Sequence, residues 1–277
     1  MKTLKNFALL ILTLFIFSCA SESANDLVGI GNHNYENKNY DQAIETYKKA
    51  LEIDPNSALA FYGLGIAFAA KEEFDKAVEN YQKSIEINPK LYQNYYGLGT
   101  SYFEKSKLGE AEKNYQKSIE LNPKHESSYF SLGKLYEKKG ELEKASEVYE
   151  NAIGIAPKNY NILVSYGELA LRLKDNEKAI SVFSTLLEEN SEEPILLYKL
   201  GNAYHSKGEF GKAVEFYEKT LGFDPDFKNA YFALGNIFES QGKKEEAILN
   251  FEKYLQLNPQ QTEAQVVRTK IHKLKGN

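Results

Sequence analysis

The sequence predicts an all-α fold, an α-solenoid of about seven antiparallel helix pairs followed by a C-terminal capping helix. Three sets of residues that recur every 34 positions predict it: prolines, glycines and alanines. They are Pro55, Pro89, Pro123, Pro157, Pro225 and Pro259; Gly31, Gly65, Gly99, Gly133, Gly167, Gly201 and Gly235; and Ala43, Ala77, Ala111, Ala145, Ala179, Ala213 and Ala247. A fixed period of about 20 to 50 residues is typical of repeat arrays, which bind on extended surfaces rather than in a single pocket.

The composition predicts a folded chain without a nucleic-acid partner. The 277 residues are 42% hydrophobic and 26% charged, which is the balance of a globular protein and argues against disorder. The formal net charge is -5, so the chain lacks the basic surface on which nucleic-acid binding depends. We therefore expect one quasi-linear domain that binds another kind of partner.

Residues 1–18 predict a signal peptide. Lys2 and Lys5 make the start basic, residues 7–17 are apolar apart from Thr13, and small residues follow. The apolar stretch is too short to span a bilayer comfortably. Export from the cytoplasm is the expected consequence.

Cys19 is the only cysteine and directly follows this apolar stretch. Its surroundings resemble a bacterial lipobox, although Phe17 is bulkier than the residue usual there. The resemblance implies that Cys19 carries a thioether-linked diacylglycerol and further acyl chains such as palmitate, with residues 19–26 as a tether. The expected location is a membrane face of the bacterial cell envelope, periplasmic or at the outer membrane. In the alternative, an ordinary signal peptide is cleaved after Ala20 and Cys19 is lost.

Seven repeats are expected over residues 24–261. Their bounds are 24–57, 58–91, 92–125, 126–159, 160–193, 194–227 and 228–261. The glycine and the alanine allow the two helices of a pair to approach closely, since a larger residue there overpacks the contact. An aromatic column fills the space between successive repeats. It consists of Tyr47, Tyr81, Tyr115, Tyr149, Phe183, Tyr217 and Phe251. Proline ends each second helix, because it restricts the residue before it and lacks an N–H.

The repeat resembles the tetratricopeptide repeat. In the third copy the pattern reads Tyr95, Leu98-Gly99, Tyr102, Ala111, Tyr115 and Pro123. The resemblance covers residues 24 to 261 and implies helix pairs stacked into a right-handed superhelix with a concave groove. It also implies a non-enzymatic scaffold that binds a protein or peptide partner in that groove.

The fifth repeat departs from the pattern, and the chain continues past the seventh. Ser191 stands where a proline is expected, Pro194 comes late, Leu186 replaces a small residue and Ala170 replaces an aromatic one. We expect a looser or slightly rotated joint near residues 187–194, one that could divide the array into subsets of four or five repeats and two. Residues 262–277 are expected to form the capping helix, with a wet outer face. Its expected apolar face consists of Val266, Val267, Ile271 and Leu274.

The resemblance implies that the first helix of each pair lines the groove, which indicates candidate binding residues. Five aromatic side chains, called here the groove aromatics, are expected to point inward: Tyr62, Tyr96, Phe130, Tyr198 and Phe232. Asn202 and Asn236 lie one helical turn beyond the last two. Aromatic rings suit an extended or helical peptide, and asparagines hydrogen-bond a peptide backbone. In the alternative, the groove aromatics only pad the inner wall.

No catalytic, cofactor or metal site is expected. The four histidines are far apart and follow no metal-binding spacing, and the glycines belong to the repeat rather than to a phosphate-binding loop. The expected function is a lipid-anchored adaptor. One alternative is a structural envelope protein that associates with itself into a homo-oligomer. A less favoured one is a substrate-recruiting subunit of a glycosyltransferase or of a secretion or pilus assembly complex.

Lipidation of Cys19 predicts a definite mass for the mature protein. The membrane-extracted chain should begin at Cys19 and carry acyl chains, since two or more chains are needed for stable anchoring. Intact-mass spectrometry of the wild type and of Cys19→Ala measures this, and the variant should carry none. A mature chain that begins unmodified at Ser21 would contradict lipidation.

Overall fold

The computed structural model describes residues 23–257 and 262–276, and this part of the chain contains helices and no strand. The expected signal peptide and Cys19 lie outside the described residues. Seven first helices begin at the expected repeat starts: α2 (Ala24–Glu36), α4 (Ala58–Ala70), α6 (Tyr92–Glu104), α8 (Glu126–Lys139), α10 (Tyr160–Arg172), α12 (Pro194–Lys207) and α14 (Lys228–Ser240). Seven second helices follow them: α3 (Tyr40–Ile53), α5 (Phe74–Ile87), α7 (Leu108–Leu121), α9 (Leu142–Ile155), α11 (Asn176–Glu189), α13 (Phe210–Phe223) and α15 (Lys244–Leu257). A last helix, α16 (Thr262–Leu274), completes the all-α solenoid.

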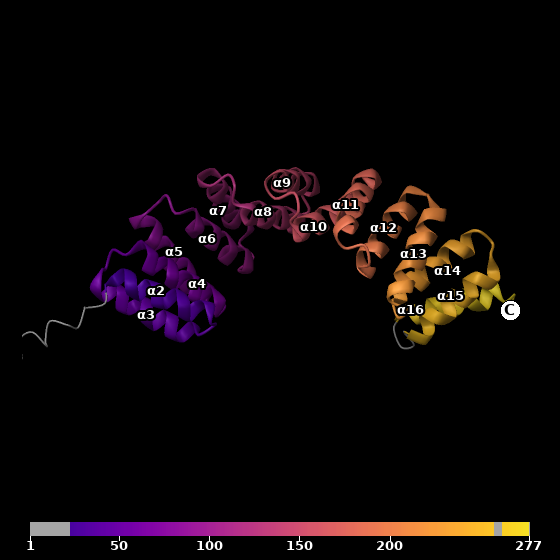
Figure 1. The fold of residues 1–277 in the computed structure, drawn as a ribbon, viewed down its shortest axis with the longest axis horizontal. Helices are drawn as coiled ribbons and strands as arrows, with labels where there is room; N and C mark the ends of the chain where they lie inside the picture. Colours follow the sequence, from indigo (N-terminus) through magenta and orange to yellow (C-terminus); the bar gives the residue numbers. More distant parts are fainter. Residues whose placement is uncertain (1–22, 258–261, 277) are drawn as a thin grey trace, which may run out of the picture. The chain divides into compact units, whose positions relative to one another are not determined.

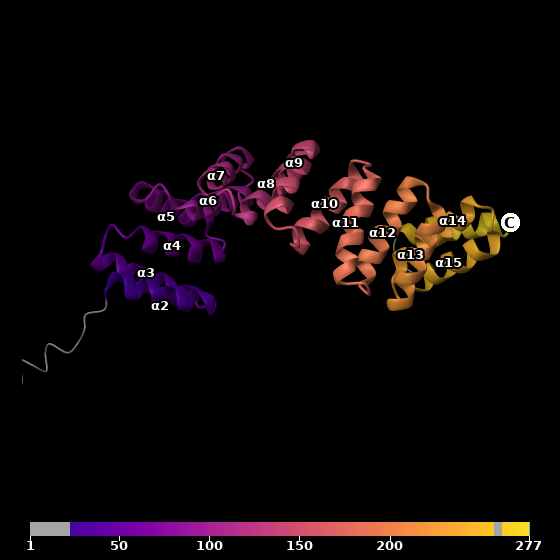
Figure 2. The same cartoon turned by 45° about the horizontal axis from the view of Figure 1, so that its top comes forward.

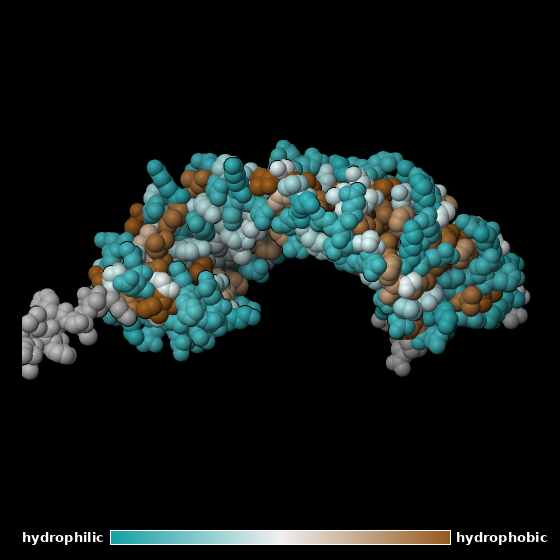
Figure 3. Space-filling view, in the orientation of Figure 1, coloured by the Kyte–Doolittle hydropathy of each residue, from teal (hydrophilic) through white to brown (hydrophobic). Residues whose placement is uncertain are grey.

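The helices form two compact units, of which the first ends at Leu135 and the second begins at Tyr136, inside α8. In the first unit each helix from α2 to α7 packs on the next, and in the second unit the same holds from α9 to α16 (Figures 1 and 2). Hydrophilic residues cover most of the visible surface of each unit, with hydrophobic residues in small separate patches (Figure 3).

The departures of the fifth repeat do not divide the chain at residues 187–194, where a looser joint was expected. There α11 packs directly on α12. Leu186 is 5% exposed and Leu196 is fully buried, so the larger leucine belongs to the core. Pro194 occupies the first turn of α12, where its missing N–H has no intrahelical partner to lose.

In six of the seven pairs, an aromatic ring of the second helix lies against the glycine of the first helix. A β-carbon added at Gly65 would lie 2.5 Å from Cε1 of Tyr81, and one added at Gly167 would lie 2.7 Å from Cζ of Phe183. The same contact occurs in repeats one, three, six and seven. Such distances leave no room for a side chain, so glycine is required there although it weakens a helix by about 1 kcal/mol.

The turn between the two helices of a pair contains one residue with positive φ. In three repeats it is glycine, at Gly140, Gly208 and Gly242. In four others a larger residue adopts this conformation, with φ between 56° and 62°: Lys38, Glu72, Ser106 and Lys174. Because a side chain is unfavourable in the left-handed region, the tight turn must be stabilised by the packing of the two helices that it joins.

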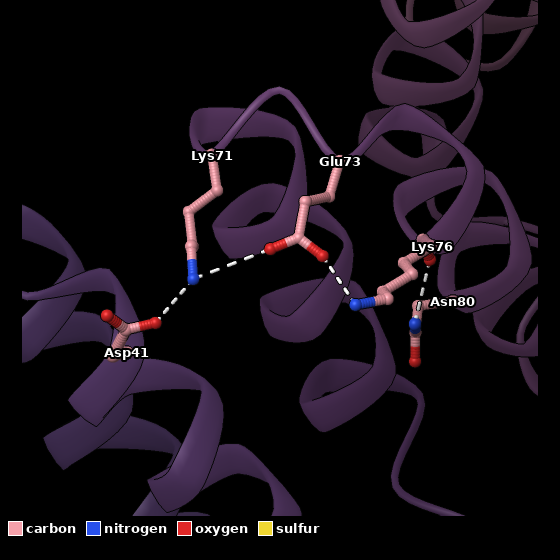
Figure 4. Close-up of polar contacts among 5 residues, drawn as sticks. All are labelled: Asp41, Lys71, Glu73, Lys76 and Asn80. Carbon is pink, nitrogen blue, oxygen red and sulfur yellow. Dashed lines mark hydrogen bonds and ion pairs between the residues drawn. The ribbon is translucent and has the colours of Figure 1, made fainter.

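Ion pairs on the surface link neighbouring repeats in the first unit. Lys71 Nζ lies 2.5 Å from Asp41 of the preceding repeat and 3.4 Å from Glu73, which also pairs with Lys76 at 2.5 Å (Figure 4). The Asn80 side chain donates to the Lys76 carbonyl oxygen at 2.8 Å (Figure 4). Because these charges are exposed, they add little stability, and the packed rings hold the repeats together.

The last helix packs on α15 through one apolar face. Val267 is fully buried and Ile271 is 9% exposed, and both pack in a cluster with Phe251. Val266, expected on the same face, is instead 56% exposed. Successive residues of a helix differ in direction by about 100°, so Val266 cannot share the face of Val267.

Candidate functional site

The five groove aromatics all lie on first helices, three in the first unit and two in the second. Among the first helices, α2 contacts α4 and α4 contacts α6 in the first unit, and α10 contacts α12 in the second. The outer surface of the first helices in each unit is called here the first-helix face. Tyr62 and Tyr96 thus lie on first helices that contact each other, α4 and α6.

Each groove aromatic is half-buried. Four of them pack at a tilt on the ring of the aromatic column in the same repeat. Ring centroids are 6.1 Å apart for Tyr62 and Tyr81, 6.1 Å for Tyr96 and Tyr115, 5.6 Å for Tyr198 and Tyr217, and 6.2 Å for Phe232 and Phe251. One part of each ring thus belongs to the core, and the remainder is open to a ligand. Tilted aromatic pairs of this kind are favourable and fix the ring orientation.

The two candidate asparagines, Asn202 and Asn236, differ in what they contact. The Tyr217 hydroxyl donates to Asn202 Oδ1 at 2.8 Å, and the Tyr47 hydroxyl donates to Asn32 Oδ1 at 2.7 Å. Asn202 was expected to contact a ligand, but its carbonyl oxygen already serves a buried tyrosine. Asn236 lies in a repeat whose aromatic column holds Phe251, which has no hydroxyl to donate. This internal pairing was not predicted from the sequence, although the 15-residue spacing from asparagine to tyrosine recurs in repeats one and six.

His125 lies between two rings at the same face. Its ring centroid is 4.8 Å from that of Tyr92 and 5.0 Å from that of Tyr96. Its Nδ1 lies 2.8 Å from the hydroxyl oxygen of the buried Ser128. Burial lowers the pKa of His125, and the neighbouring Glu126 partly offsets this. The imidazole is therefore uncharged near neutral pH and acts as an aromatic wall of the face.

A cavity of about 270 Å³ opens on the first-helix face of the first unit. Residues of α2, α4, α5 and α6 line it: Tyr35, Tyr62, Ile66, Ala69, Ala70, Tyr81, Gln93, Tyr96, Gly97 and Thr100. Two groove aromatics are among them, and none of the ten carries a charge. In the described part of the chain, no group of three or more histidine, cysteine, aspartate or glutamate residues is placed to hold a metal ion.

Family models match most of the repeats. A model described as TPR repeat matches residues 31–71, 99–140 and 201–242. Two models described as tetratricopeptide repeat match residues 58–91 and 229–261, and residues 126–159. The matched ranges leave out residues 160–200, which include the divergent fifth repeat.

Solved structures share the fold at low sequence identity. The C-terminal part of a TPR repeat-containing protein from Cytophaga hutchinsonii has a TM-score of 0.75 and 19% identity, covering 87% of this chain and 98% of that one. YrrB, described as a TPR protein with an unusual peptide-binding site, has a TM-score of 0.61 and 22% identity, covering 69% and 98%. A tetratricopeptide repeat protein from Parabacteroides merdae has a TM-score of 0.57 and 20% identity, covering 93% and 100%. No curated protein matches the chain significantly.

The buried tyrosines predict loss of stability in alkali. Burial raises the pKa of Tyr115 from 10.0 to about 12, although hydrogen bonds with Thr100 and Ser131 lower it. Tyr115 ionises at a lower pH in the unfolded chain than in the folded chain. Its contribution to the free energy of unfolding is therefore complete below about pH 10 and is lost as the pH rises toward 12. Urea unfolding at a series of pH values should show wild-type stability falling more steeply than that of Tyr115→Phe, by about 1.4 kcal/mol per pH unit. Equal slopes would contradict the burial of this hydroxyl.

Proposed function

Because the chain belongs to the tetratricopeptide repeat family, we propose that it is a non-enzymatic adaptor that binds a peptide or protein segment on its first-helix face. Members of this family generally mediate protein–protein interactions. The observation that carries the proposal is the set of half-buried groove aromatics, which recur at one position in five of the seven first helices. Aromatic side chains dominate the binding energy of many protein interfaces.

The packing of these rings supports recognition. Tyr198 packs on Tyr217 and on Phe227, with ring centroids 5.6 and 4.9 Å apart. Phe232 packs on Phe251 and on Tyr254, at 6.2 and 5.3 Å. A ring held from two sides loses little freedom when a partner covers its open part, so less binding energy is spent on ordering it.

The anchor is the second part of the proposal. We propose that Cys19 is lipidated and that the adaptor is held at a membrane face of the bacterial cell envelope. Support comes from the basic start, the apolar stretch and the position of the single cysteine. In the described residues, no helix has the length and apolar character needed to cross a membrane. A lipid would then be the link between the repeats and the bilayer.

Removal of two neighbouring groove aromatics tests the binding face. The Tyr96→Ala and Phe130→Ala double variant should capture less of the partner proteins from envelope extracts, as quantified by mass spectrometry of pull-downs. Tyr96 packs on Tyr115 and His125, so some stability is lost, and capture is compared at a temperature where circular dichroism shows both proteins folded.

Phe223→Ala is the matched control. This variant also loses a phenylalanine ring, but from the second helix α13, where Phe223 is 50% exposed. It should capture the same proteins as the wild type. Unchanged capture by the double variant, or equal loss with Phe223→Ala, would overturn binding at the first-helix face.

A further inference from the structure

Tyr81 is exceptional among the tyrosines of the aromatic column because its hydroxyl has no hydrogen-bond partner in the described part of the chain. Tyr81 as a whole is 2% exposed and lines the cavity on the first-helix face. The hydroxyls of Tyr47, Tyr149 and Tyr217 donate to Asn32, Glu137 and Asn202 at 2.7, 2.7 and 2.8 Å. That of Tyr115 is 3.4 Å from Thr100. In the described part of the chain, Tyr81 Oη is not one of the fully buried polar atoms without a partner, so it opens onto the cavity, where a ligand can accept from it.

Two residues that differ from their equivalents in other repeats explain why the Tyr81 hydroxyl has no partner. In repeats one, three and six, the residue directly after the column glycine accepts from the tyrosine, but in repeat two that residue is Ile66, which has no acceptor. In repeat three, Ser131 of the next repeat's first helix, α8, also forms a hydrogen bond with the Tyr115 hydroxyl. The equivalent residue beside Tyr81 is Gly97, whose β-carbon would collide with the ring. Ile66 and Gly97 both line the cavity.

The cavity walls define the chemistry of the ligand. None of the ten lining residues is charged, and the rings of Tyr35, Tyr62 and Tyr96 stand with Ile66 around the Tyr81 hydroxyl. Burial raises the pKa of Tyr81 well above its ordinary value, and the nearby tyrosines add to this, so the hydroxyl remains a donor. Gln93 Oε1 is buried without a partner and can accept from a donor. One peptide bond offers both an acceptor and a donor.

The size of the cavity limits what enters it. Sites for drug-sized ligands enclose about 300 to 1,000 Å³, so a cavity of about 270 Å³ is suited to one or two side chains rather than to a whole small molecule. Desolvating a charged peptide end against uncharged walls is unfavourable. An uncharged interior stretch of a peptide therefore fits, and a terminal carboxylate does not.

We propose that this cavity is a specificity pocket that takes an apolar side chain from the interior of an extended peptide, with the Tyr81 hydroxyl donating to the adjoining peptide carbonyl oxygen and Gln93 accepting from a peptide N–H. The inference rests on the proposed function and names the part of the partner that the first unit selects. Selection comes from the uncharged wall and from the one unpaired hydroxyl.

Peptide binding to the full chain in detergent tests the pocket. The probes are nine-residue peptides, acetylated and amidated at their ends, in a library that varies the central residue. Isothermal titration should show binding with central leucine, isoleucine, methionine or phenylalanine and loss of binding with central aspartate or lysine. Tyr81→Phe should weaken the best peptide by about three- to tenfold, the range expected for one hydrogen bond.

Two further variants distinguish the effect of the free Tyr81 hydroxyl on peptide binding from an effect on folding. Ile66→Asn should weaken the same peptide to a similar extent, because its amide would accept from Tyr81 as Asn32 does from Tyr47. Tyr217→Phe also removes one hydroxyl from the column, but one that Asn202 already satisfies, and should bind like the wild type. Phenylalanine occupies this column in repeats five and seven, at Phe183 and Phe251. Tyr81→Phe and Tyr217→Phe therefore both suit the fold.

Three results would overturn the pocket: equal affinity of Tyr81→Phe and wild type, no library peptide bound by the wild type, or decanoate bound as tightly as the best peptide, which would identify an acyl-chain site. The proposed function is judged separately. If the wild type still captures envelope proteins and the groove double variant does not, adaptor binding stands although the pocket fails.

Discussion

The contact between an aromatic ring and a glycine is the constraint on which the rest of this structure depends. A solenoid has no central core, so each helix pair must be held by its own contacts and by those with its neighbours. The ring of the second helix fills the gap that the missing side chain leaves in the first helix, and Tyr47, Phe183, Tyr217 and Phe251 are completely buried there. Because packed interiors tolerate few voids and little overlap, this contact fixes how far the two helices slide past each other.

The same rings support the binding face. A groove aromatic rests on the ring below it, so the contact that sets the helix pair also orients the side chain that a partner would meet. The repeats differ in whether the ring carries a hydroxyl and in which residue accepts a hydrogen bond from it. Asn202 accepts from Tyr217, phenylalanine removes the hydroxyl in repeats five and seven, and Ile66 and Gly97 leave Tyr81 without a partner. Nearly identical folds thus present different chemistry along one chain.

Much of the fold follows from the sequence because the 34-residue period records packing. The glycine and ring columns mark a contact that recurs in six of the seven pairs, and every residue of the alanine column is fully buried. Features that do not recur with the period, such as the conformation of one turn or the burial of one residue, are harder to predict. Lys38 and Lys174 adopt positive φ because the two helices impose the turn, and no residue preference indicates it. The burial of Leu186 likewise depends on the space available between two particular helices.

The candidate site was predicted less completely than the fold. Its residues lie on the expected helices, but nothing in the sequence directly indicates that Asn202 accepts from Tyr217 or that Tyr81 is unpaired. Both facts follow from comparing one column with another across repeats, since a hydroxyl and its acceptor come from different helices. Such pairings become visible only when two columns are known to lie face to face.

A double-mutant cycle at one ring and its glycine tests the central contact most directly. Gly167→Ala and Phe183→Leu are measured singly and together by urea unfolding, with Gly29→Ala, where no atom lies near the added β-carbon, as the control. Gly167→Ala should destabilise the wild type but cost much less beside leucine, giving a coupling of about 0.5 to 3 kcal/mol, whereas Gly29→Ala should stabilise. Additive effects at Gly167 and Phe183 would contradict the account.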